Sequence, residues 1–202
     1  MTTYATLKSD IASWLVDDDI TNMEPAFIRL AEAAIRRDVR CRAMETTATL
    51  SIASGSASVP SGFLEAKRLI LDNTTSWALD YMPPDAMYSA SVYHETGSNA
   101  AVYTIEGDSI IFRPATTESA KLLYIKAFDA LSGSTDTNWL LTNAYDVYLY
   151  GALIHSAPYL RDDARVALWA EGYRSAVRGV NTMENRARVG GGPLRPMGAS
   201  GP

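Results

Sequence analysis

Both ends of the chain carry apolar residues at helical spacing. In residues 3–43 the apolar positions recur every three or four residues, in two runs separated by the acidic turn Asp17–Asp19. Thr21 and Glu24 have the spacing of a capping box, so a second helix is predicted to begin there. The same periodicity returns over residues 139–185. The sequence therefore predicts four helices, two from each end of the chain.

The middle of the chain alternates instead. Short runs of alternating apolar and polar residues fill positions 45–130, and they are separated by glycine- and proline-containing turns. Gly107-Asp108 is a strong hairpin signal, and Pro83–Asp85 can begin a short helix that extends to about residue 93. Tight hairpins connect antiparallel strands and cannot connect parallel ones. We therefore expect an antiparallel β-sheet or small sandwich.

These patterns together predict an α+β fold in which a four-helix bundle from both chain ends carries an inserted antiparallel β region and an extended C-terminal tail. The predicted domains are a helical bundle of residues 1–44 and 139–185, the β region 45–130, a polar linker 131–138, and a flexible arm 186–202. Within the bundle, the helix that begins near Asn143 is apolar on nearly every side, so it should lie at the centre. Pro158 should end or kink that helix.

Composition and charge narrow the possible partners. The 202 residues carry 18 basic and 23 acidic side chains, a net charge of −5, which disfavours stable binding to nucleic acid. The longest apolar run, Val147–Ile154, is far shorter than the ~20 residues of a membrane span, and the N-terminus does not resemble a signal peptide. Cys41 stands alone, as expected of a protein folded in a reducing cytosol. We expect no membrane partner.

No motif in the chain indicates catalysis. His94 fits a surface loop and His155 the end of an apolar helix, and one cysteine with two distant histidines does not make a zinc site. Gly190–Gly192 lacks the ending of a phosphate-binding loop, and Asp17–Asp19 lacks the spacing of a calcium loop. We therefore expect no catalytic residue, no cofactor and no metal.

Aromatic residues gather in the last two predicted helices. They belong either to the core or to a face between subunits, where tyrosine and tryptophan are enriched, and the pattern leaves both interpretations open. The set comprises Tyr145, Tyr148, Tyr150, Tyr159, Trp169 and Tyr173.

The C-terminal segment has an unusual composition. Residues 185–202 contain five glycines, three prolines, three arginines and no acidic residue, which is too little apolar surface to fold alone. The segment is either a passive end or a peptide that docks in the groove of a partner. In the second case the candidate partner-binding residues are Arg186, Arg188, Leu194, Arg195 and Met197.

The helical ends resemble a known family. The N-terminal part is similar to the beginning of head-to-tail adaptor proteins of tailed bacteriophages. The similarity lies in residues 4–15, residues 27–40 and Met44-Glu45. Residues 143–153 and 157–169 resemble the closing helices of the same family. The resemblance covers about half of the chain.

The resemblance implies a structural virion protein at the head-tail junction, made in the cytoplasm of the bacterial host. Such adaptors bind beneath the portal protein, usually as a ring of 12 copies, join it to tail or nozzle proteins, and leave a channel for DNA. An acidic protein suits that role, because it lacks the excess of cationic side chains that would bind the phosphates tightly.

Two other functions stay open at this stage. A tail-associated hydrolase would reveal itself in a catalytic assay on cell wall or polysaccharide. A small-molecule-binding β-module would need a large internal pocket in the sheet.

Overall fold

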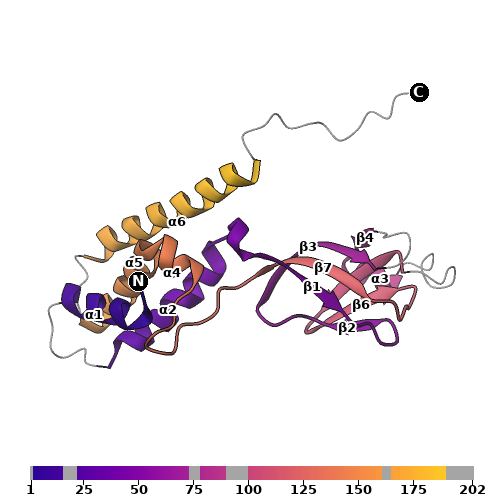
Figure 1. Cartoon of the computed structure of the whole chain (residues 1–202), viewed down its shortest axis with the longest axis horizontal. Coiled ribbons are helices and arrows are strands. Elements are labelled where there is room, and N and C mark those ends of the chain that lie inside the picture. Colours follow the sequence, from indigo (N-terminus) through magenta and orange to yellow (C-terminus); the bar gives the residue numbers. More distant parts are fainter. Residues whose placement is uncertain (1, 16–21, 73–77, 90–99, 161–164, 190–202) are drawn as a thin grey trace. The chain divides into compact units, whose positions relative to one another are not determined.

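The computed structural model describes residues 2–15, 22–72, 78–89, 100–160 and 165–189. It divides into two compact units (Figure 1). The helical unit consists of residues 1–43 and 128–202, and the β unit of residues 44–127. The predicted α+β class is confirmed.

The helical unit contains five α-helices among its described residues, one more than the sequence predicted. The additional helix, α4, is a short turn that begins after Asn138, whose side chain accepts a hydrogen bond from the Leu141 backbone N–H at 2.9 Å. Such N-caps favour helix initiation. The helices are α1 (Tyr4–Leu15), α2 (Glu24–Asp38), α4 (Trp139–Asn143), α5 (Tyr145–Leu160) and α6 (Val166–Val189).

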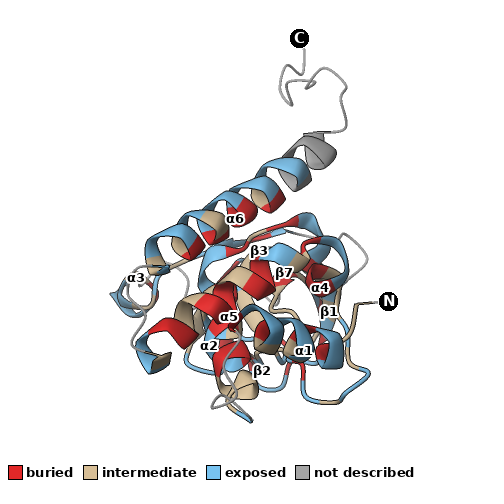
Figure 2. Ribbon diagram, turned by 90° about the vertical axis from the view of Figure 1, so that its left-hand side faces the viewer, coloured by how far each residue is buried: buried red, intermediate tan, exposed pale blue. Residues whose placement is uncertain are grey.

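Helix α5 is the centre of this unit, as its all-round apolar sequence predicted. It packs against α2 and α6 and also contacts α1 and α4. It is buried along most of its length, whereas one face of α6 is exposed (Figure 2). Of the two predicted effects of Pro158, an end or a kink, the first is wrong, because the helix continues through Pro158 to Leu160.

The start of α2 differs from the predicted capping box. Its N-cap is Met23, which makes no side-chain capping hydrogen bond, and Thr21 lies outside the described residues. Pro25 occupies the first turn, where a missing N–H costs little.

The β unit is one curled sheet of seven strands. The strands are β1 (Glu45–Leu50), β2 (Ser56–Ser58), β3 (Phe63–Leu71), β4 (Ala78–Tyr81), β5 (Val102–Glu106), β6 (Ser109–Arg113) and β7 (Ala120–Lys126), in the sheet order β1-β7-β3-β4-β5-β6-β2. A short helix, α3 (Pro84–Ser89), follows β4.

The sheet is mixed, so the prediction of a wholly antiparallel sheet is wrong at one position. Strands β4 and β5 pair in parallel, with Asp80 opposite Val102 and Tyr81 opposite Tyr103. A parallel pair needs a crossover, and the 20 residues between these strands, which include α3, are long enough to supply one. The other strand pairs are antiparallel, including the predicted hairpin at Gly107, whose φ is +55°.

The inside of the curled sheet is the core of the β unit. The side chains at its centre are aliphatic or aromatic and have almost no exposed surface, as in close-packed interiors. The core consists of Leu50, Ile52, Ala57, Leu69, Leu71, Leu79, Ala100, Tyr103, Ile110, Phe112, Ala120, Leu122 and Tyr124.

The segment predicted as a polar linker makes specific contacts inside the helical unit. The backbone carbonyls of Ser134 and Asp136 accept hydrogen bonds from the N–H groups of Ala5 and Tyr4, at 3.1 and 2.9 Å. The carboxylate of Asp136 in turn accepts from the backbone N–H groups of Ser132 and Gly133. The segment therefore satisfies the first free donors of α1, which a helix cannot satisfy by itself.

Helix α6 is longer than the sequence indicated. It continues to Val189, so Arg186 and Arg188 lie in its last turn and not in an extended arm. The reason is composition, because residues 184–189 contain good helix formers and the first glycine comes only at position 190. Leu194, Arg195 and Met197 lie outside the described residues.

Candidate interaction surfaces

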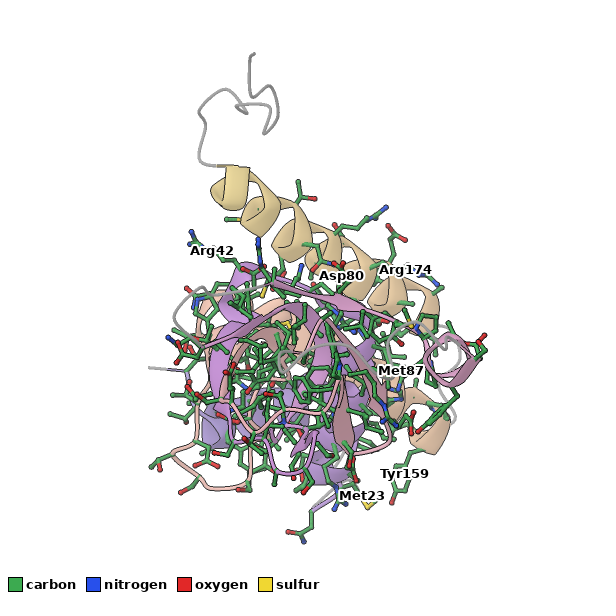
Figure 3. The ribbon with its side chains drawn as sticks, turned by 90° about the vertical axis from the view of Figure 1, so that its right-hand side faces the viewer. Met23, Arg42, Asp80, Met87, Tyr159 and Arg174 are labelled. Carbon is green, nitrogen blue, oxygen red and sulfur yellow. The ribbon has the colours of Figure 1, made fainter. Side chains whose placement is uncertain are left out.

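The aromatic residues of α5 and α6 divide between core and surface. Tyr148, Trp169 and Tyr173 are buried, which fits the core interpretation. Tyr159 is 50% exposed, projects away from the ribbon (Figure 3), and packs the edge of its ring against Phe27, with ring centroids 5.9 Å apart. Only part of this cluster is therefore available to a partner.

The tyrosine hydroxyls at the margin of the helical core have polar partners. Tyr173 donates to the Asp38 carboxylate at 3.0 Å, and burial together with this bond raises the pKa of Tyr173. Tyr145 donates to Asp10 at 2.5 Å, and the same two causes raise the pKa of Tyr145. These bonds connect α5 and α6 to α1 and α2, because each hydroxyl reaches a different helix. These two hydrogen bonds therefore hold these helices together.

One face of α6 offers apolar surface to solvent. Leu168 and Met183 are each 71% exposed, at opposite ends of the helix. A groove of about 400 Å³ lies between α6 and the start of α5, and its α6 wall contains Gly172, Gly179 and Met183. Met183 also lines the groove, so exposed apolar surface and a hollow adjoin at this end of the helix. This face is the candidate interface of the helical unit.

A larger groove lies in the β unit, where the sheet forks. Strand β3 pairs with β4 only at Leu69 and Ile70. The following residues of β4, Asp80 and Tyr81, pair with β5 instead. Between them is a groove of about 650 Å³ that is open to solvent. It is lined by residues 63–68 of β3, residues 78–81 of β4, Tyr103 and Ile105. It is not the internal pocket that a small-molecule-binding module would need.

A third hollow of about 340 Å³ adjoins the β5–β6 hairpin. Glu106 and Arg113 line it, and Glu106 Oε1 and Arg113 Nε are buried atoms that have no hydrogen-bond partner among the described residues. The other carboxylate oxygen of Glu106 accepts a hydrogen bond from the Tyr88 hydroxyl at 3.1 Å. Because both orphan atoms have almost no exposed surface, a ligand in the hollow cannot reach them directly.

The candidate catalytic and metal-binding residues form no reactive site in the described structure. His155 is partly buried, and burial and the nearby Arg37 lower its pKa, so the ring is neutral near pH 7. No group of three His, Cys, Asp or Glu side chains gathers as a metal site in the described ranges. His94, Asp17–Asp19 and Gly190–Gly192 lie outside those ranges.

None of the helices that the structure describes is long and apolar enough to cross a bilayer.

Comparison with protein-family models relates the chain to known proteins. The family model described as "SU10 adaptor protein" matches residues 2–197, which include both helical ends and the whole β unit. A search of the curated proteins found no match.

Proposed function

This chain belongs to the SU10 adaptor protein family, as the resemblance of its helical ends predicted, and we propose that it forms a ring beneath the portal that joins the phage head to the tail. It is a structural adaptor of a phage virion. The observation that carries the proposal is the family match from residue 2 to residue 197. In the proposed assembly, 12 copies bind the portal on one side and tail or nozzle proteins on the other, and DNA passes through the channel.

Two features of the helical unit support such an assembly. Leu168 and Met183 leave apolar surface on α6, and Met183 lines the groove between α6 and the start of α5. A ring requires that one patch of a subunit meets a different patch of the next subunit, which is a head-to-tail contact. The exposed face of α6 and the projecting Tyr159 provide two different patches.

The net charge of −5 agrees with passage of DNA without stable binding. We propose no catalytic step, because the shifted pKa values in the described structure have burial or a hydrogen bond inside the fold as their main cause. An assay for release of cell-wall or polysaccharide fragments tests this point, and turnover by the purified protein would favour the hydrolase alternative.

The decisive experiment combines the full-length protein with the purified portal. We expect native mass spectrometry and particle images to show a cyclic ring of adaptor copies on one end of the portal. Leu168→Glu and Met183→Glu should weaken ring formation without changing the melting temperature, because both side chains are exposed. A two-fold symmetric dimer that does not bind the portal would contradict the proposal.

A further inference from the structure

The groove between β3 and β4 has the chemistry of a peptide-binding site. Phe63, Tyr81 and Tyr103 supply aromatic walls, and Tyr81 is 55% exposed although its ring packs edge-on against Tyr103, with centroids 5.6 Å apart. Its volume of about 650 Å³ lies within the usual range of ligand sites, about 300–1,000 Å³. Tyr81 therefore offers the largest aromatic surface in the groove to an incoming chain, since Tyr103 is only 5% exposed.

The groove also offers a stretch of β3 backbone and a negative charge to an occupant. No described strand pairs with residues 63–68 of β3 on the side that faces β4, so this stretch of backbone adjoins the groove. Asp80 lines the groove and forms no ion pair within the described residues. Lys67 also lines it, but its ammonium group is 3.8 Å from the Glu45 carboxylate. The free carboxylate of Asp80 favours a cationic side chain in the occupant.

The chain itself contains a segment with matching chemistry. Residues 193–197 read Pro-Leu-Arg-Pro-Met, and the two prolines at i and i+3 favour polyproline II, an extended helix with three residues per turn. In that conformation Pro193 and Pro196 form one ridge, Leu194 and Met197 form a second, and Arg195 lies on the third. Proline-rich segments of this kind dock in aromatic grooves at low entropic cost, because their conformation is preformed.

Charge complementarity favours the same pairing. The β unit carries nine acidic and five basic residues, whereas residues 185–202 carry three arginines and no acidic residue. Two apolar ridges can contact the aromatic walls while Arg195 reaches Asp80. We propose that the β3–β4 groove binds the segment Pro193–Met197 of another copy of this protein.

This contact would add a second link between neighbouring copies in the ring proposed above. The proposal rests on the proposed function only in that the ring makes the two copies neighbours. A segment of one subunit that occupies a groove on the next is a head-to-tail contact, the kind that closes a ring. One such contact is weak, but the contacts of a complete ring act together through a high effective concentration.

Titration of a synthetic peptide of residues 189–202 tests the groove. The receiving protein is the full chain with Pro193→Ala and Pro196→Ala, so that its own segment competes less. We expect saturable binding that weakens about tenfold with Tyr81→Ala, because a truncated aromatic anchor typically costs that much. Asp80→Asn should weaken binding and make it less sensitive to salt.

Matched controls separate the groove from general effects. Tyr88→Ala removes a tyrosine of similar exposure, 58%, from α3 outside the groove lining and should leave peptide binding unchanged. A peptide with Arg195→Glu, Pro193→Ala and Pro196→Ala should not bind. Melting temperatures of all protein variants show whether each one is folded. No saturable binding, or equal binding by the Tyr81→Ala and Tyr88→Ala proteins, overturns the proposal.

Disulfide trapping decides between another copy and the same chain. Full-length protein with Tyr81→Cys is mixed with full-length protein with Met197→Cys, and the native Cys41 is buried and should not interfere. We expect a disulfide-linked dimer in the mixture and much less in either protein alone. A third protein carries both Tyr81→Cys and Met197→Cys in one chain. If that protein forms only an internal disulfide and the mixture forms no disulfide-linked dimer, the second-copy assignment is wrong.

The portal experiment remains independent of this test. Loss of portal binding with intact peptide binding contradicts the proposed function alone, whereas portal binding without peptide binding contradicts only the groove assignment.

Discussion

At the scale of single residues, Asn138 stabilises two helices at once. It caps α4, and its amide donates to the buried hydroxyl of Tyr148 at 2.8 Å. Asn138→Ala should lower the free energy of unfolding by about 2–3 kcal/mol, since both a cap and the partner of a buried hydroxyl are lost. Urea unfolding measures this. Asn143→Ala is the control, because the exposed bond of Asn143 to Trp139 should matter by less than about 0.5 kcal/mol. Equal losses for both variants would refute the role of Asn138.

His155 predicts a pH dependence at the same scale. Burial and Arg37 disfavour its protonated form in the folded protein, so the unfolded chain binds the proton more tightly. The stability that the neutral ring provides is present above its ordinary pKa of about 6.5 and is lost as the pH falls through that value. The melting temperature should therefore fall less between pH 7 and pH 5.5 in His155→Gln than in the unaltered protein. An equal fall in both proteins would count against it.

At the scale of elements, two glycines show which helix faces are packed. A Cβ atom at Gly151 of α5 would be 3.1 Å from the Ala31 Cβ of α2, whereas at Gly179 of α6 it would meet no atom within 4 Å. Alanine is favoured over glycine inside helices by about 0.8–1.0 kcal/mol. Thermal or urea unfolding should show that gain for Gly179→Ala but not for Gly151→Ala, where α2 and α5 must move apart. An equal gain at both positions would mean that the α2–α5 contact is loose.

At the scale of the whole molecule, the β unit has a core of its own. All of its core side chains lie between Leu50 and Tyr124, and the described sheet needs no strand from outside residues 44–127. A fragment of residues 44–127 should therefore fold and unfold cooperatively, as circular dichroism and NMR dispersion can show. A fragment that ends at residue 119 lacks β7, which pairs with both β1 and β3, and should not fold. If the longer fragment is also unfolded, the β unit depends on the helices.

The sequence predicted most of the elements because their signals are local. The all-round apolar sequence of α5 predicts a central helix, and Gly107 predicts a hairpin. Each signal lies within a few residues, and both predictions are confirmed. The parallel pairing of β4 with β5 was missed because it depends on a crossover of 20 residues, which leaves no local pattern. The sequence does not indicate the short helix α4, because its capping residue Asn138 ends the polar stretch 131–138, whose composition predicts a linker. The β3–β4 groove arises from a fork between strands and has no sequence signature.

The pairing of β1 with β7 has a mechanical consequence. The chain enters the β unit through β1 and leaves through β7, and these strands are antiparallel neighbours, with Glu45 opposite Ile125 and Leu50 opposite Ala120. The entry and the exit therefore lie at the same end of one ladder. A tensile load between the two units is carried by two covalent connections in parallel. Force that separates the units pulls both strands in the same direction, so it does not unzip the hydrogen bonds between them.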